Sequence, residues 1–214
     1  MPEQTDIAEK STPQSTVYYD QRSVALRTTQ SIYFVQEHDK MAMLELLLND
    51  YKDTQMVIVV KSKKKADALN AFLVSKVFKS QSVHGNHREE QQQKAAKEFN
   101  QGVLNVIITT DMIFKTLTLE NIKLVLSYDL PELPQEYYNR IAFMKELGIA
   151  IALVSPEDEP LLSDIEYNMK KEIEEKIVEG FVATSKPAQI NKRKKDRTKK
   201  PRHRKNKIQK ETNI

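Results

Sequence analysis

The feature that most constrains the fold is a repeated alternation of short apolar runs with amphipathic stretches of helical length, between residues 31 and 178. Runs such as MVIVV are apolar on both faces, which is typical of parallel strands that are covered by helices on both sides. The pattern therefore predicts a three-layer α/β domain with a mostly parallel sheet. Its strands are expected at 31–36, 56–60, 81–84, 105–110, 123–129 and 149–154.

Local signals predict where several of the intervening helices begin. Ser62 is well placed as an N-cap, and Pro134 as the start of a later helix. Pro156 and its acidic neighbours suit the first turn of a last helix over 155–178. Function in such sheets sits beyond the carboxyl ends of the strands. The segments of interest therefore follow Val60, Val83, Thr110 and Tyr128.

The charge of the chain is unevenly distributed. From Lys186 onward there are 13 Lys and Arg against two acidic residues, a balance of +11, although the whole chain carries only +4. This segment has almost no apolar side chains to bury, so we expect a disordered tail. So dense a run of like charge favours attraction to a polyanion, with a solubility tail as the alternative. The expected divisions are an extension at 1–30, a domain at 31–178 and a basic tail at 179–214.

Composition restricts the cellular compartment in which the chain is expected. It has no cysteine, which removes disulfides and thiolate metal sites. The first thirty residues lack the apolar core of a signal peptide, and no run approaches the ~20 apolar residues that span a bilayer. These observations predict a soluble, cytoplasmic protein.

The strand ends carry KSKKKAD, HGNHREEQQQKAAKEFNQG, TTDMIFKTLTL and YDLPELPQEYYNRIAFMKELG, in that order. Over about residues 31–166 this series resembles the carboxyl-terminal RecA-like domain of DEAD-box RNA helicases. The resemblance rests on YDLP at 128–131, on HG at 84–85 and on the order and spacing of the segments. It implies a RecA-like fold.

The positions that serve the nucleotide in the resembled family are degenerate here. Lys115 and Thr118 stand where the family has Arg and a nucleotide-holding Asp. Arg140 remains, but Phe143 and Glu146 replace the two arginine fingers. Such a guanidinium is worth roughly 10³ to 10⁵ in rate in phosphoryl-transfer enzymes. Two phosphate-side positions on the preceding helix are also changed, to Glu89 and Gln92.

A second argument against ATP hydrolysis comes from glycine spacing. A phosphate loop needs two glycines five residues apart followed by Lys. The glycines of this chain lie at 85, 102, 148 and 180, and no DEAD-like acidic run is present. The sequence therefore predicts no cofactor and no hydrolysis by the chain alone.

RNA recognition is better supplied. The resemblance implies contacts from Ser62, Gly85 and Thr110 to the sugar-phosphate backbone, with charge added by Lys63. The alternative is that this lysine belongs to a solvated helix face and that Ser62 is only a cap. In the tail, the candidate RNA-binding residues are Lys194, Lys195, Arg197, Arg202 and Arg204.

Other candidate residues carry weaker signals. His84 and His87 suggest a metal pair, but no further ligand completes a site, so no metal is expected. Asp111 is interpreted as a tie between loops rather than as a base. Tyr137 and Tyr138 are interpreted as core residues.

Three functions are consistent with the sequence. The first is a non-catalytic RNA-binding module that uses a helicase-like domain and a basic tail. The second is one half of a split helicase that works with a separate first RecA-like domain. The third is a decayed pseudogene product or a protein-interaction scaffold, whose globular part has no useful RNA affinity. The partners expected are therefore RNA and a second helicase domain or ribonucleoprotein.

Overall fold

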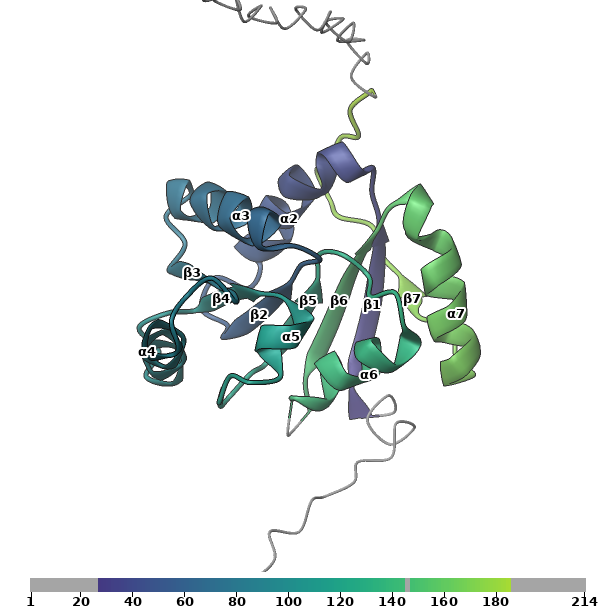
Figure 1. Cartoon of the computed structure of the whole chain (residues 1–214). Coiled ribbons are helices and arrows are strands. Elements are labelled where there is room, and N and C mark those ends of the chain that lie inside the picture. The colour runs from purple at the N-terminus through teal and green to yellow at the C-terminus, as the bar shows by residue number, and fades with distance from the viewer. Residues whose placement is uncertain (1–26, 145–146, 186–214) are drawn as a thin grey trace, which may run out of the picture. The chain divides into compact units, whose positions relative to one another are not determined.

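A computed structural model describes residues 27–144 and 147–185 of the chain (Figure 1). Its seven strands form one sheet in the order β3-β4-β2-β5-β6-β1-β7, and every neighbouring pair is parallel. The predicted three-layer α/β fold is thus confirmed. The strands are β1 (Thr29–Phe34), β2 (Met56–Val59), β3 (Ser80–Val83), β4 (Val106–Thr109), β5 (Leu124–Ser127), β6 (Ile149–Val154) and β7 (Glu174–Glu175).

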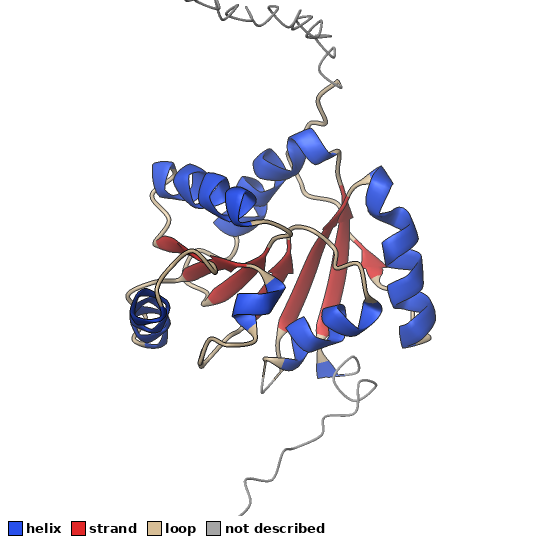
Figure 2. Ribbon diagram, in the orientation of Figure 1, coloured by secondary structure: helices blue, strands red, loops and turns tan. Residues whose placement is uncertain are grey.

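Helices cover both faces of this sheet (Figure 2). The α-helices are α2 (Lys40–Asn49), α3 (Lys63–Ser75), α4 (Glu89–Asn100), α5 (Asp111–Phe114), α6 (Pro134–Ala142) and α7 (Glu159–Met169). Short 3-10 helices, η1 (Glu37–Asp39) and η2 (Pro156–Asp158), precede α2 and α7. One core lies under α2 and α3, and a second core lies under α4, α5, α6 and α7.

The strands are buried for the reason that their sequences suggest. All four residues of β2 and of β4 are inaccessible, because alternate side chains enter the two cores. Ser62 caps α3 as expected, since its Oγ accepts a hydrogen bond from the Lys65 N–H at 3.2 Å. Pro134 occupies the first turn of α6, also as expected.

The helix predicted over 155–178 is wrong from residue 170 onward. Helix α7 ends at Met169, and Lys170 adopts a left-handed conformation with φ of 53°. The chain then turns, Ile173 enters the core, and β7 pairs with β1. Burial of Ile173 and pairing with β1 outweigh the helix propensity of the Lys and Glu residues in this segment.

Beyond β7 the chain continues along the domain as far as residue 184. Val178 and Phe181 pack against the core under α2 and α3. The N–H and hydroxyl of Thr184 donate to the Asp39 carboxylate at 2.9 and 2.5 Å. These hydrogen bonds lower the pKa of Asp39. The last described segment is thereby held against η1.

The predicted basic tail from residue 186 onward lies outside the described residues, and so does the extension at 1–26. Among residues 27–144 and 147–185, no helix is long and apolar enough to cross a membrane.

Candidate nucleic-acid interface

Three residues that were predicted to contact RNA follow three neighbouring strands, and these strands end in register with one another. Val59 of β2 and Val83 of β3 both align with Thr109 of β4, which lies between them. Ser62, Gly85 and Thr110 come shortly after these strand ends, as predicted. Ser62 and Gly85 are exposed and Thr110 is half-buried. Two hydroxyl-bearing residues and a glycine therefore lie together at the carboxyl ends of these strands.

Lys63 lies next to Gly85. A Cβ atom built on Gly85 would lie 3.5 Å from Lys63 Nζ and 3.9 Å from Ile113 Cδ1. The ammonium of Lys63 donates to Asn86 Oδ1 at 2.8 Å. The loops after β2, β3 and β4 thus converge at Gly85. Asn86 was not singled out from the sequence, although its place directly after HG at 84–85 is the signal that could have identified it.

The first turn of α3 is unusually basic. Lys63, Lys64 and Lys65 occupy positions where the positive end of the helix dipole disfavours cations. Lys65 is compensated, because its ammonium contacts Glu37 at 2.7 Å and Asp129 at 2.6 Å. Burial opposes the charge of Lys65, but the hydrogen bonds to these carboxylates outweigh it and raise its pKa. Lys63 and Lys64 are exposed and form no ion pair within the described residues.

Histidines support the turn that carries Gly85. The buried His84 ring contacts Asp67 Oδ1 at 2.8 Å, and its backbone N–H donates to His87 Nδ1 at 3.1 Å. The two rings stack with centroids 4.1 Å apart. Burial and His84 lower the pKa of His87. Among the described residues, no three His, Cys, Asp or Glu side chains are grouped in a way that could hold a metal ion.

A buried arginine joins the loops on the other side of Thr110. Arg140, 1% exposed, donates from Nε and Nη2 to the two Asp111 oxygens at 2.6 and 2.7 Å. Its Nη1 donates to Ser127 Oγ and to the Asp129 carbonyl. Asp111 therefore ties loops together, in agreement with the interpretation from the sequence.

Two of the positions that serve the nucleotide in the resembled family, Lys115 and Phe143, contact neighbouring side chains. Lys115 Nζ lies 2.6 Å from a Glu136 carboxylate oxygen. Phe143 packs against Phe114 with ring centroids 4.3 Å apart and the ring planes tilted by 33°, and it is half-buried. Lys115 and Phe143 also line a pocket of about 400 Å³ together with Asn139 and Ala142.

Other positions of this group are less informative. Thr118 is exposed, and its backbone carbonyl accepts a hydrogen bond from the Asn100 side chain at 3.0 Å. Glu146 lies outside the described residues, as do Lys194, Lys195, Arg197, Arg202 and Arg204.

A fully buried lysine was missed from the sequence. Lys40 Nζ lies 3.0 Å from Asp158 Oδ2, 3.0 Å from Glu37 and 3.8 Å from Asp129. Burial opposes the charge of Asp158, but hydrogen bonds from Ser155 and Lys40 outweigh it and lower its pKa. Only Glu37 is close in sequence, whereas Asp129 and Asp158 follow β5 and β6, so the local sequence does not mark Lys40 as buried.

Comparisons with known proteins agree with this geometry. The profile of the helicase conserved C-terminal domain matches residues 39–142. The ATP-dependent RNA helicase SUB2-2 of Vanderwaltozyma polyspora is 31% identical over 167 residues, which cover 76% of this chain and 38% of that protein. The ATP-dependent RNA helicase vasa of Drosophila melanogaster is 34% identical over 119 residues, which cover 56% of this chain and 18% of vasa.

A solved structure shows the same fold. S. cerevisiae Dbp5 bound to RNA and ADP BeF3 matches with a TM-score of 0.68 at 23% identity, covering 75% of this chain and 44% of that one. This chain thus spans less than half the length of these relatives. Its folded part belongs to the helicase conserved C-terminal domain family, in the RecA-like form found at the carboxyl end of DEAD-box RNA helicases.

Proposed function

We propose that this chain is a non-catalytic RNA-binding module. The observation that carries the proposal is the convergence of Ser62, Gly85 and Thr110 after neighbouring strands, beside the ammonium group of Lys63. Hydroxyls, backbone amides and lysines are the groups that contact phosphate oxygens in nucleic-acid complexes. Dbp5, whose fold is the same, is bound to RNA in its solved structure.

The start of α3 supports an anionic ligand at this site. Lysines in a first helical turn cost roughly 0.3–1 kcal/mol each through the helix dipole. A phosphate beside Lys63 would offset part of that cost, because it accepts a hydrogen bond from that ammonium group and faces the positive end of the dipole. Lys65, already held by Glu37 and Asp129, contributes mainly to the shape of the site.

The side chains at the nucleotide-side positions support the non-catalytic part of the proposal. Phe143 is packed on Phe114, and Lys115 is held by Glu136. Neither supplies a free guanidinium to a developing phosphoryl charge. The described residues thus offer contacts for a nucleic-acid backbone but not the charge that phosphoryl transfer requires.

The basic segment from Lys186 onward is proposed to add affinity without sequence preference, through Lys194, Lys195, Arg197, Arg202 and Arg204. The domain divisions at residues 30 and 178 and a cytoplasmic location remain predictions.

A second candidate function is one half of a split helicase. Its supporting observation is that the match to SUB2-2 covers 38% of the length of that protein. In that case a separate first RecA-like domain would be the partner. This alternative predicts RNA-stimulated ATP hydrolysis when that domain is added.

Gly85 provides the test of the proposed interface. Glu at this position would place a carboxylate near Lys63 Nζ, neutralise that cation and repel phosphate. We expect Gly85→Glu in the full chain to weaken binding of single-stranded RNA about tenfold to a hundredfold, measured by fluorescence anisotropy. The matched control is Gly85→Ala, whose Cβ would make only ordinary contacts of 3.5 Å or more. Equal affinity of both folded variants would refute the interface.

A further inference from the structure

The sheet ends at β7, the last strand in the order. The Lys176 N–H donates to the Ile32 carbonyl of β1 at 2.9 Å. Because backbone groups of successive strand residues point to opposite edges, the N–H and C=O of Glu175 face away from β1. No further strand lies beyond β7 in the described part of the chain. The outer side of β7 therefore presents backbone donors and acceptors to an incoming chain.

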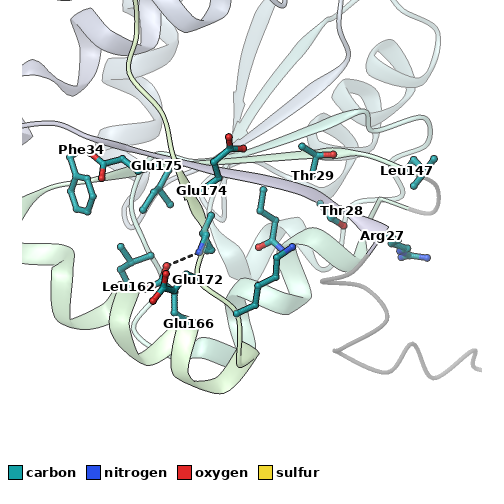
Figure 3. Close-up of a pocket in the computed structure, with 14 residues that line it drawn as sticks. Arg27, Thr28, Thr29, Phe34, Leu147, Leu162, Glu166, Glu172, Glu174 and Glu175 are labelled. Atoms are coloured by element: carbon teal, nitrogen blue, oxygen red, sulfur yellow. Dashed lines mark hydrogen bonds between the residues drawn. The ribbon is translucent and has the colours of Figure 1, made fainter.

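A groove of about 880 Å³ runs beside this edge (Figure 3). Its floor includes the buried side chains of Ile32 and Ile173, and its rim includes the exposed Phe34 and Leu147. Phe34 is 40% exposed and Leu147 is 79% exposed, so apolar surface is available at both ends of the groove. The groove thus offers apolar contacts in addition to the backbone groups of β7.

The groove is predominantly acidic. Four carboxylates line it against two cations: Glu166, Glu172, Glu174 and Glu175 against Arg27 and Lys171. Glu166 accepts a hydrogen bond from the Ile173 N–H at 2.8 Å, and Glu174 lies 3.4 Å from Lys176 Nζ. Glu172 and Glu175 are exposed and form no ion pair within residues 27–144 and 147–185. An occupant with positive side chains would complement them.

We propose that this edge binds an extended, lysine- or arginine-containing segment of a partner protein. The segment would add a parallel or antiparallel strand to β7 and place alternate basic side chains beside Glu172 and Glu175. Charged residues on a short edge strand can also serve simply to prevent pairing between sheets. The apolar groove distinguishes the two roles, since an edge that only repels other strands has no need of an apolar floor.

The probe is a short synthetic peptide that alternates Lys and Val. Its matched control carries the same side chains but N-methyl groups at alternate residues, so that it keeps the charge and loses the backbone donors. We expect the first peptide to bind the full-length chain at least about tenfold more tightly than the control in isothermal titration calorimetry. Hydrogen exchange should then show protection of the Glu175 and Ile177 amides.

Charge reversal locates the site. Glu175→Lys should weaken binding of the peptide about tenfold. Glu90→Lys, an equal change at an exposed position of α4, should leave the affinity unchanged. The proposal is overturned if the N-methylated peptide binds equally well or if both variants lose affinity equally. It is also overturned if the amides of β7 are already protected in the free chain through self-association, which would make a second copy the occupant.

Discussion

The loops after β2, β3 and β4 and the neighbouring region of α5 and α6 differ in how their polar groups are used. At the first, Lys63 and Lys64 are exposed and the only hydrogen bond of the Lys63 ammonium among the described residues goes to Asn86. At the second, Arg140 is bound to Asp111 and Lys115 is bound to Glu136. We call these the open edge and the closed region.

The difference indicates which polar groups remain available to a ligand. Groups of the open edge lose little when they exchange water for phosphate, because they have few internal partners to give up. Groups of the closed region would have to break hydrogen bonds or ion pairs first. This difference is consistent with the proposal that the ligand is RNA rather than a nucleotide.

The largest expected effect concerns the rate of ATP hydrolysis when the chain is combined with a first RecA-like domain. The chain mixed with RNA, ATP, magnesium and a competent first RecA-like domain should hydrolyse ATP slower than an intact helicase by roughly 10³ or more. Phosphate release is the measurement. Arginine at positions 143 and 146 together should raise the rate if the missing guanidiniums are the cause. Robust RNA-stimulated turnover by the unmodified mixture would instead favour the split helicase.

The next effect concerns stability of the closed region. Asp111→Ala leaves the buried Arg140 without its carboxylate, so the free energy of unfolding should fall by about 3–5 kcal/mol. Urea denaturation followed by circular dichroism measures it. Lys63→Ala, at the open edge, should change that free energy by less than about 0.5 kcal/mol. Similar losses in both variants would remove the distinction between the regions.

A third effect separates the open edge from the basic tail. Deletion of residues 186–214 should lower RNA affinity more than about tenfold and reduce the salt slope by about 0.7 for each phosphate that the tail neutralises. The thermal midpoint should stay nearly constant. RNA titrations at several salt concentrations give the slope. Undiminished affinity after the deletion would assign the tail to solubility alone.

The smallest expected effect concerns the pH dependence of stability. It depends on the hydrogen bonds from Thr184 to Asp39, which lie outside both regions. Because these bonds hold the pKa of Asp39 below its usual value, they stabilise the fold above about pH 4, and that stability is lost as the pH falls through the lowered pKa. Thr184→Val should therefore be less stable at neutral pH and converge with the parent in acid, as urea denaturation at a series of pH values would measure. Thr184→Ser, which keeps the hydroxyl, should follow the parent. Parallel curves for Val and parent would contradict this role of the hydroxyl.

Much of the fold could be predicted because fully buried parallel strands leave a simple signal. The runs at 56–60 and 149–154 match β2 and β6 within one residue. The segment 170–178 could not be predicted in this way, since its Lys and Glu residues favour helix locally. Its conformation depends on Ile173 and on β1, which lies far away in sequence.

The candidate site was predictable in position but not in its internal contacts. The order of the strands could not be read from the chain, yet the strand ends located Ser62, Gly85 and Thr110. The hydrogen bond from Lys63 to Asn86 and the packing of Phe143 against Phe114 join segments more than twenty residues apart. Such pairings depend on tertiary packing, for which one sequence carries no local pattern.

The position of β1 also affects how the chain acquires its structure during synthesis. Although β1 precedes the other described strands in the sequence, it lies between β6 and β7, and Thr29 pairs with Ile149. Closing so long a loop has a large entropic cost, and folds dominated by distant contacts form slowly. On the ribosome, β1 must therefore wait without its partners until most of the domain has emerged, and an interrupted chain would expose its apolar strand to aggregation.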